Sequence, residues 1–409
     1  MTGNRVGIIG AGPAGIMAAL EAAALGAQVS LYDTNPMVGR KLLVTGNGRC
    51  NISNLEARAE RYVTDDPGAL ARILARCGPE LILQRLQELG IPTYATHDGW
   101  CYPLSDSAAT VADALAAALD LAGVHVHLRT MVSDLRPESG GLMLVTGGET
   151  HHVDRAVVAT GGKAHPSLGS KGRMFPVLEK LGHTVLPVWP ALTAIECDMR
   201  PVRDLQGVRM DVGLSIYAGA NLLGSTVGNL MFTKTGLSGP APMDLSYLVS
   251  THSDTSTHSD ASLMARVDLL ALHRDALLAL LARYREQPMP VRVALGAVLP
   301  AKVPPVILAL AGLAPESTLA ETTDDALDHL LRLLENLELR VRDVRGFQFA
   351  QLSTGGVPLA EVNPHTMASA RVPGVYLAGE TLNVMGPCGG HNLQFAWATG
   401  MLAGRGAAP

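Results

Sequence analysis

The sequence is poor in charge, in cysteine and in basic runs. Only 17% of its 409 residues are charged, the formal net charge is −5, and no run of lysine and arginine exceeds two residues. Such a chain lacks the positive surface that attracts nucleic acid or an acidic membrane, so we expect neither as a partner. Its five cysteines are an odd number without a CxxC motif, which disfavours structural zinc and favours a reduced, cytoplasmic setting.

The apolar N-terminal stretch does not have the pattern of a leader or a membrane span. Positions 6 to 27 are mostly apolar, but they contain a glycine-rich turn, Pro13 and Glu21. We therefore interpret them as part of a βαβ unit and expect no targeting segment. What the chain does have is 47% hydrophobic residues over 409 positions. This composition predicts a well-packed globular protein of two or three domains.

The most informative motif is Val6–Gly15, with the sequence VGIIGAGPAG. An apolar strand leads into a GxGxxG turn, and an Ala-rich helical run continues to about Leu25. A second apolar strand begins at Val29 and ends at Asp33. This strand–turn–helix–strand context makes the glycine pattern a specific sign of dinucleotide binding.

Each position of the turn has a physical task. Gly10 permits the tight turn, Gly12 lets the backbone approach a pyrophosphate, and Gly15 lets the helix pack on the strand. The helix N-terminus offers free N–H groups and partial positive charge to the phosphates. Asp33 is placed to accept from a ribose hydroxyl, and an acid there disfavours a 2′-phosphate. We predict that a dinucleotide binds here.

Hydrophobic periodicity predicts the remaining elements. Helices are expected at 68–76, 79–89, 107–122 with Ser107 as the cap, 273–285, 291–299, 303–313, 323–337 and 392–402. Strands are expected at 124–128, 142–145, 153–159, 193–197, 208–214, 226–232, 265–269, 338–349 and 374–380. The short alternating segments between 187 and 270 indicate a small antiparallel sheet or barrel. Because the chain end returns to an α/β pattern, the nucleotide-binding domain is expected to be split by an insertion.

A polar repeat lies inside the insertion, at residues 251–262, THSDTSTHSDAS. Its two histidines and two aspartates raise the alternative of a metal site. Low-complexity polar composition favours a solvated surface loop, so we predict no metal.

The end of the chain favours flavin over nicotinamide as the resident cofactor. A strand ending in Gly379-Glu380 is followed by a glycine-rich turn through Gly389 and Gly390 and by a helix. FAD spans a sheet, so it needs a polar group near its ribityl chain and a helix N-terminus near its ring. The helix dipole would stabilise negative charge on the reduced ring.

These motifs together resemble the BaiN-like flavoproteins, also described as aminoacetone oxidase-like FAD-binding enzymes. The resemblance runs over nearly the full length in the family's order. It is carried by Gly39–Asn51, Ala159–Gly162, Leu230–Pro240, Leu352–Pro364, Gly379–Glu380 and Gly389–Gly400. It implies an α/β fold: a Rossmann FAD domain of the two-dinucleotide-binding type, with an inserted β-barrel and a helical subdomain. The implied boundaries are 1–188 and 350–409 for the FAD domain, 189–270 with the return strand 337–349 for the barrel, and 271–336 for the helical subdomain.

The resemblance also assigns candidate cofactor-binding residues. The pyrophosphate, adenosine, ribityl and ring ends are expected at Gly10, Gly12, Pro13, Ala14, Gly15, Asp33, Arg40, Lys41, Gly48, Arg49, Cys50, Val132, Thr160, Gly161, Gly379, Glu380, Gly389, Gly390, Asn392 and Leu393. The chain departs from the family at Asn383 and Met385, where acidic residues are common, and at His391, where tyrosine is common. These departures lie close to the expected flavin face, so a particular relative's substrate does not transfer.

Four side chains are candidates for chemistry, each with a simpler alternative. His391 is the best-placed candidate for a general acid, because histidine titrates near neutral pH, and the simpler alternative is a side chain that merely orders the turn. Lys234 is either an active-site lysine or a surface lysine. Cys50 has no partner cysteine about four residues away, which favours packing over redox chemistry. Cys388 precedes a helix, where a thiol pKa can fall, and the simpler alternative is an unreactive thiol.

Three functional hypotheses follow. The first is an NAD(P)H-linked FAD oxidoreductase that reduces a small, carbonyl-conjugated or similar organic substrate through non-covalent flavin. The second is a flavin oxidase of a small amine that releases hydrogen peroxide. The third is a flavin-binding protein from a different class, in which the insert docks a partner: it has either an RNA-modifying or redox-sensing role or no catalytic role at all. No second GxGxxG domain is present for a nicotinamide, so NAD(P)H would bind transiently, and a monomer or homodimer is expected.

Overall fold

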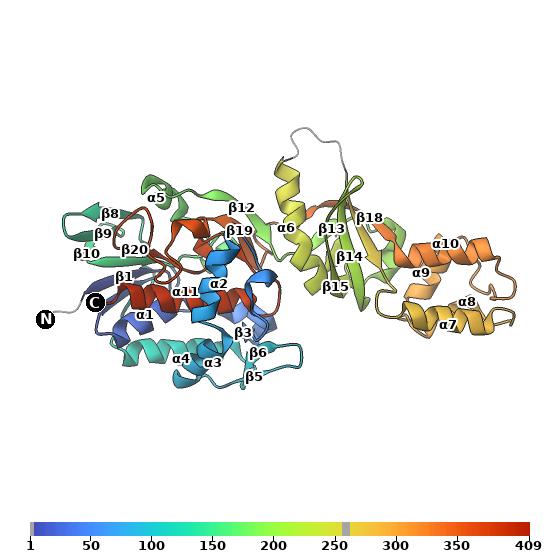
Figure 1. Ribbon diagram of the computed structural model, residues 1–409, viewed down its shortest axis with the longest axis horizontal. Helices are drawn as coiled ribbons and strands as arrows, with labels where there is room; N and C mark the ends of the chain where they lie inside the picture. Colours follow the sequence, from blue (N-terminus) through green and yellow to red (C-terminus); the bar gives the residue numbers. More distant parts are fainter. Residues whose placement is uncertain (1–3, 256–261) are drawn as a thin grey trace. The chain divides into compact units, whose positions relative to one another are not determined.

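The computed structural model describes residues 4–255 and 262–409, and the chain divides into two compact units. One unit comprises Met1–Trp189 with Gln351–Pro409, and the other comprises Pro190–Ala350 (Figure 1). The first unit is therefore assembled from two separate parts of the chain. Six residues of the polar repeat, 256–261, lie outside the described residues.

The first unit is built on a five-stranded parallel sheet in the order β20-β11-β1-β2-β7. The strands are β1 (Arg5–Ile9), β2 (Gln28–Tyr32), β7 (His125–His127), β11 (Arg155–Val158) and β20 (Val375–Leu377). Four of the five residues of β1 are buried, as expected for a strand covered on both faces. The edge strand β20 comes from the end of the chain, so the sheet joins both parts of the unit. The α/β fold class predicted from the sequence is confirmed.

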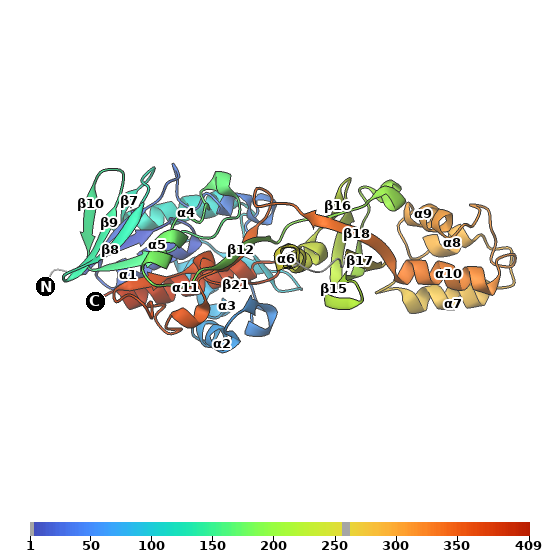
Figure 2. The same ribbon diagram turned by 90° about the horizontal axis from the view of Figure 1, so that it is seen from above.

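Helices cover one face of the parallel sheet and a small antiparallel sheet covers the other (Figures 1 and 2). The covering helices are α1 (Pro13–Ala24), α4 (Ala108–Leu121) and α11 (His391–Ala407). The small sheet is β10-β9-β8, made of β8 (Asp134–Glu138), β9 (Gly141–Val145) and β10 (Thr150–Val153). Its approach to β1 needs Gly7, because a Cβ there would lie 2.5 Å from Leu144 Cδ1.

The first and last helices of the unit, α1 and α11, pack backbone against backbone. A Cβ at Gly400 would lie 2.3 Å from the carbonyl oxygen of Ala14, and one at Gly404 would lie 2.3 Å from that of Ala18. Glycine and alanine at these four positions therefore allow an approach that larger side chains would block. This crossing ties the end of the chain to its beginning.

Shorter elements complete the first unit. The helices are α2 (Pro67–Arg76), α3 (Pro79–Glu88) and α5 (Phe175–Lys180), with 3-10 turns at Leu42–Gly48, Ala59–Arg61, Pro166–Leu168, Leu359–Glu361 and Gly379–Thr381. The strands pair as β3 (Ser53–Asn54) and β5 (Thr93–Ala95) with β6 (Trp100–Pro103), β4 (Val63–Thr64) with β21 (Val384–Met385), and β12 (Leu186–Ala191) with β19 (Leu352–Gly356). The predicted cap of α4 is present, since Ser107 Oγ accepts from Thr110 N at 3.4 Å.

The second unit contains a closed barrel in the order β13-β16-β15-β14-β17-β18. Its strands are β13 (Ile195–Cys197), β14 (Arg209–Ala218), β15 (Asn221–Phe232), β16 (Gly236–Ser238), β17 (Leu263–Asp268) and β18 (Leu337–Val344). Along β14 every second residue is buried from Val212 to Ala218, the period-2 pattern that predicted a barrel. Between β17 and β18 the chain forms α7 (Arg274–Tyr284), α8 (Val291–Gly296), α9 (Val303–Leu310) and α10 (Asp324–Glu335).

The sequence interpretation of residues 187–270 as strands alone was wrong at one element. Helix α6 (Pro240–Thr255) lies between β16 and β17 and packs against β15. Its sequence has weak helical periodicity and two prolines, Pro240 and Pro242, which lower any helix expectation. Proline is tolerated in the first turn of a helix, where its missing N–H has no intrahelical partner.

Within the described residues, no helix combines the length and apolar character needed to cross a bilayer.

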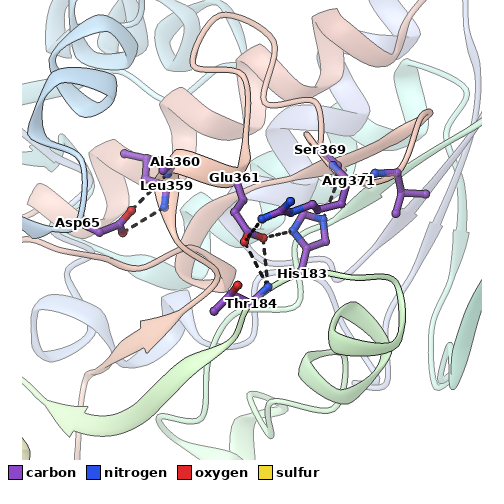
Figure 3. A network of polar contacts seen from close by, with 9 residues as sticks. Asp65, His183, Thr184, Leu359, Ala360, Glu361, Ser369 and Arg371 are labelled. Atoms are coloured by element: carbon purple, nitrogen blue, oxygen red, sulfur yellow. Dashed lines mark hydrogen bonds and ion pairs between the residues drawn. The ribbon is translucent and has the colours of Figure 1, made fainter.

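A buried polar network joins the two parts of the first unit (Figure 3). His183 Nδ1 lies 2.8 Å from Glu361 Oε2, and its Nε2 lies 2.8 Å from Ser369 Oγ. The same carboxylate accepts from Thr184 N at 3.1 Å and from Arg371 Nη2 at 2.9 Å. The imidazole is fully buried and the Glu361 side chain is only 9% exposed. Because a buried charge without partners is costly, this network favours one arrangement of residues 359–371 against His183 and Thr184, which follow α5.

The network predicts a specific acid sensitivity. Burial raises the pKa of Glu361, but hydrogen bonds from Arg371, His183 and Thr184 outweigh it and lower the pKa from 4.5 to about 2. A lowered carboxyl pKa stabilises the fold above pH 4.5, and this stabilisation is lost as the pH falls towards 2. We expect Glu361→Gln to cost about 1–3 kcal/mol at pH 7. It should also lose less further stability below pH 4.5 than the parent protein does.

Urea unfolding followed by circular dichroism at several pH values measures this difference. The exposed acid Glu179, on α5, provides the matched control as Glu179→Gln, which should follow the parent curve. Parallel acid limbs for Glu361→Gln and the parent would contradict the assignment.

Candidate functional site

Three glycine-containing turns lie at the same edge of the parallel sheet. Strands β1, β11 and β20 run parallel, and each ends in one of the predicted cofactor segments. These segments are Gly10–Gly15, Thr160–Gly161 and Gly379–Glu380. In open α/β sheets, ligands bind outside the carboxyl ends of the strands, so the topology brings the predicted segments to the expected edge.

In the first turn, Gly10 and Gly15 are required by the fold, whereas Gly12 faces open space. A Cβ at Gly15 would lie 1.8 Å from the Gly10 carbonyl oxygen, and Gly10 itself has φ of +105°. A Cβ at Gly12 would meet no atom of the described residues within 4 Å. Helix α1 then starts at Pro13, and no described side chain caps it. The turn therefore presents backbone donors and room for a phosphate group.

Asp33 lies directly beside this turn. Its carboxylate accepts from Ala11 N at 2.6 Å and from Asn35 N at 2.7 Å, which orients it at the tip of β2. Arg40 Nη1 donates to Asn35 Oδ1 at 2.9 Å, so this predicted residue contacts the segment that orients Asp33. The buried residue Val132 follows the segment in which Thr130 N donates to the Asp33 carbonyl at 2.8 Å. The adenosine-end candidates thus gather at one corner of the sheet.

Two other candidates, 339 residues apart, form an ion pair. Lys41 Nζ lies 2.6 Å from Glu380 Oε2, and both side chains are largely buried. The other carboxylate oxygen accepts from Ser353 N at 2.9 Å and from Ser353 Oγ at 2.8 Å. A Cβ at Gly162 would lie 2.8 Å from that oxygen, so the glycine turn after β11 closes on the same group. This cluster joins the loop Gly39–Asn51, which we call the signature loop, to the ends of β11 and β20.

A second helix N-terminus faces the site edge at α11. Gly389 and Gly390 have φ of +102° and +98°, and a Cβ on them would meet Trp100 at 2.6 Å and the Ser53 carbonyl oxygen at 2.2 Å. The Asn392 side chain is used within the turn, accepting from Gly386 N at 2.7 Å. Among the described residues no side chain caps α11. Its first N–H groups and its partial positive charge are therefore available to a ligand.

The predicted residues next to this helix behave as packing groups. Leu393 packs against the core of the first unit, and Gly379 N donates to Thr399 Oγ1 at 2.9 Å. A Cβ at Gly379 would lie 2.9 Å from Ala14 Cβ, so the end of β20 touches the start of α1. These positions hold the two helix N-termini in place.

The signature loop is held in a strained backbone conformation. Gly46, Asn47, Gly48 and Cys50 have φ of +58°, +55°, +87° and +66°. Two of the four are not glycine, and such left-handed residues persist where the surrounding structure imposes them, often at ligand sites. Arg49, between them, donates from Nη2 to the Tyr102 hydroxyl at 3.2 Å and lies 4.4 Å from its ring centroid.

Burial distinguishes four of the cysteines from Cys388. Burial raises the pKa of Cys50 to about 11, so its side chain is a thiol at neutral pH and belongs to the apolar core. This favours the packing alternative over a charge-transfer role. Burial likewise raises the pKa values of Cys77 and Cys101 to about 11 and of Cys197 to about 12. Cys388 is half-buried, directly before the turn that starts α11.

His391 is buried in a way that argues against a general acid. Only 3% of the residue is exposed, and neither ring nitrogen has a hydrogen-bond partner among the described residues. Burial first, and then Arg61, lower its pKa to about 4, although the nearby backbone of Cys388 and Glu56 acts in the opposite direction. The imidazole is therefore neutral at pH 7. The ring packs edge-on against Tyr62, which favours the alternative that it orders the turn.

Lys234 is an exposed residue between β15 and β16, in the second unit. Its catalytic role stays a prediction. Within residues 4–255 and 262–409, no three His, Cys, Asp or Glu side chains cluster as metal ligands do.

His165 is a candidate that the sequence analysis missed. It follows the glycine turn after β11, is half-buried and has a left-handed φ of +55°. Burial and the charge of Lys41 lower its pKa, and Glu380 opposes this shift, so the ring lies within the field of the buried ion pair. The signal in the sequence was its place three residues after Gly162. A histidine after a glycine turn is otherwise unremarkable.

Comparison with known proteins shows the family of this chain. A family model described as the HI0933-like protein Rossmann domain matches residues 4–406. The chain is 34% identical over 410 residues to the 3-dehydro-bile acid delta(4,6)-reductase of Clostridium scindens, covering 99% of both chains. It is 28% identical to the ribosomal RNA dihydrouridine synthase of Escherichia coli, over 96% of this chain and 95% of that one.

Among solved structures, the chain is similar to the 3-ketosteroid-delta4-(5alpha)-dehydrogenase from Rhodococcus jostii RHA1. The identity is 15%, the TM-score 0.48, and the coverage 99% of this chain and 96% of that one.

The fold, the family match and the full-length similarity to a reductase define an FAD-dependent oxidoreductase. The chain belongs to the HI0933-like family, and the resemblance to BaiN-like flavoproteins is confirmed.

The residues present fit FAD. The open space at Gly12, the uncapped N-termini of α1 and α11, and the oriented carboxylate of Asp33 supply the groups that a dinucleotide needs. Glu380, which follows β20, and its ion-pair partner Lys41 add polar groups at this edge. The individual residue assignments remain proposals.

The contrast between Gly12 and Gly15 gives a matched pair of variants. We expect Gly12→Val to leave the apo protein folded within about 0.5 kcal/mol. It should weaken FAD binding at least about tenfold, because the side chain takes the space meant for the phosphates. Gly15→Val should instead disrupt the apo fold, since its Cβ overlaps Gly10.

Thermal unfolding of the apo proteins and fluorescence titration with FAD measure both effects. Unchanged FAD affinity in a folded Gly12→Val protein would refute the pyrophosphate assignment.

Proposed function

We propose that this protein is an NAD(P)H-dependent reductase that saturates a carbon–carbon double bond conjugated to a carbonyl group in a small organic molecule. The single observation that carries the proposal is full-length similarity to a relative whose name describes a delta(4,6)-reductase. Two further relatives are named dihydrouridine synthases, and their names likewise describe the saturation of a ring double bond conjugated to a carbonyl. The common chemistry is hydride addition followed by protonation.

Bound FAD would supply the hydride, and the chain's own residues would bind and orient it. The N-termini of α1 and α11 place partial positive charge at two points of the site edge. The α11 end would stabilise negative charge that develops on the reduced ring. The Lys41–Glu380 pair would hold the region between them rigid, since the carboxylate is already fully engaged by Lys41 and Ser353.

Two observations favour a small molecule over RNA as the substrate. The chain has a net charge of −5 and no basic run longer than two residues, whereas RNA binding draws on phosphate neutralisation by lysine and arginine. The relative named for a small substrate is also the more similar, at 34% against 28% identity. Ribosomal RNA is nevertheless the second candidate, because two full-length relatives carry that name.

The proposal includes a cytoplasmic setting and a monomer or homodimer. The buried thiols of Cys50, Cys77, Cys101 and Cys197 suit a reducing compartment, which also supplies NAD(P)H.

Anaerobic spectroscopy of the FAD-loaded protein tests the proposal. We expect NADH or NADPH to bleach the flavin absorbance within seconds to minutes. A 4-en-3-one steroid, as a representative conjugated ketone, should then restore it and yield the saturated ketone by mass spectrometry.

The other hypotheses predict different outcomes in the same cuvette. Restoration by ribosomal RNA transcripts, with dihydrouridine as the product, would replace the small molecule by RNA. A flavin that ignores NAD(P)H but is bleached by small amines, with peroxide released in air, would replace the reductase by an oxidase. A flavin that reacts with none of these donors would support the non-catalytic alternative.

His165 is the proton donor that we propose for the second half of this reaction. Its lowered pKa means that the protonated form is lost as the pH rises through a value below 6.5. The rate of substrate reduction should therefore fall with rising pH in that range. We expect His165→Gln to lower turnover by roughly 10²-fold and to abolish this pH dependence.

FAD content and flavin reduction by NAD(P)H should be unchanged in this variant, because neither needs the proton. The exposed His97 gives a control variant, His97→Gln, with the parent's pH profile. A retained pH profile in His165→Gln would remove His165 from the mechanism.

A further inference from the structure

A cavity of about 770 Å³ lies in the first unit, at the edge of the parallel sheet opposite to the glycine turns. It opens at the amino ends of β11 and β20, whereas the proposed flavin site lies at their carboxyl ends. Its lining is mixed: apolar and glycine residues line it together with two acids, Glu138 and Asp154, and three cations, Arg155, Lys180 and Arg371. Its volume falls in the range of small-molecule sites, roughly 300–1,000 Å³.

The cations of this cavity are less well compensated than its acids. Arg155 Nη1 donates to a carbonyl oxygen, that of Asp154, at 2.8 Å. Lys180 forms no ion pair with any described residue. The Asp154 carboxylate is taken by Arg5, which donates from its backbone N at 2.7 Å and from Nη2 at 3.1 Å. Glu138 contacts His152 Nδ1 at 2.8 Å. Neither Arg155 nor Lys180 therefore forms an ion pair with a described acid, although the charge of Arg155 helps to lower the pKa of Asp154.

The third cation, Arg371, is held in place. Its Nη2 donates to Glu361 Oε1 at 2.9 Å, and Glu361 is itself held by His183 and Thr184 in the buried network (Figure 3). A flexible surface arginine would lose rotamer entropy on binding a ligand. Here that freedom is already restricted by the fold, while the remaining guanidinium N–H groups stay available. This is the preorganisation expected of a binding site rather than of a solvated surface.

We propose that this cavity is a second ligand site, which binds a small phosphorylated molecule through a diphosphate group. Phosphate oxygens match the planar fork of arginine, and lysine adds a compact positive charge. A diphosphate carries enough negative charge to compensate the charges of Arg155, Lys180 and Arg371, which line the same cavity. The site is separate from the dinucleotide turn, so both can be filled at once.

Calorimetric titration of the FAD-loaded protein with inorganic pyrophosphate tests this proposal. Bound FAD keeps the probe out of the first site, and ionic strength is held at 0.15 M to suppress unspecific attraction. We expect one saturable site with a dissociation constant below about 1 mM. Arg155→Ala and Lys180→Ala should each weaken it by about tenfold, with FAD content unchanged.

The exposed Arg72 on α2 provides the charge-matched control, since Arg72→Ala removes a cation outside the cavity. This variant should bind pyrophosphate as the parent does. No saturable binding to the parent protein, or equal binding by Arg155→Ala and Lys180→Ala, would overturn the proposal. Citrate displacing pyrophosphate at equal concentration would overturn the phosphate class.

The variant Glu361→Gln distinguishes two effects of Glu361 on pyrophosphate binding: its negative charge near the cavity and its positioning of Arg371. Removal of a negative charge near the cavity would by itself tighten pyrophosphate binding. If Glu361 positions Arg371, its loss should instead weaken binding several-fold, once circular dichroism at pH 7 has shown that the variant is folded. Tighter binding would leave Arg371 outside the site and contradict its part in the proposal.

Discussion

The close crossing of α1 and α11 is the constraint on which the candidate site depends. Each helix begins with an N-terminus that no described side chain caps, and each points its partial positive charge at the same sheet edge. The relative position of the two ends is set where Gly400 and Gly404 lie against Ala14 and Ala18. A cofactor that spans both ends therefore meets a fixed separation, which the chain sets by packing backbone against backbone.

Around this crossing, the protein uses buried polar groups to join distant parts of the chain. The Lys41–Glu380 pair joins two such parts at the site edge. The His183–Glu361 pair joins two others in the buried network of the first unit. Such pairs are poor sources of net stability, because desolvation offsets much of their attraction. They do select one arrangement, since any other leaves a buried charge unpaired. The strained loop from Gly46 to Cys50 is a further cost that this arrangement sustains.

Much of the fold and part of the site were predictable from local pattern. The GxGxxG turn, the cap at Ser107 and the barrel strands follow from glycine chemistry, capping and period-2 burial, which are properties of neighbouring residues. Helix α6 was missed because Pro240 and Pro242 obscure its start. His391 was interpreted from its unperturbed pKa, but burial lowers that pKa to about 4. Burial depends on residues 54–62, far away in the sequence, so no local pattern reports it.

The sequence by itself determined the class of cofactor and the split α/β domain with its inserted barrel, because these depend on backbone conformation and hydrophobic period. It also predicted candidate residues around the turns. Only the tertiary structure decided which of those residues meet. The Lys41–Glu380 pair, the position of His165 beside it and the charged cavity at Arg155 and Lys180 each join segments that are distant in the chain. Electrostatic energy depends on distance and burial, and both arise from packing rather than from residue order.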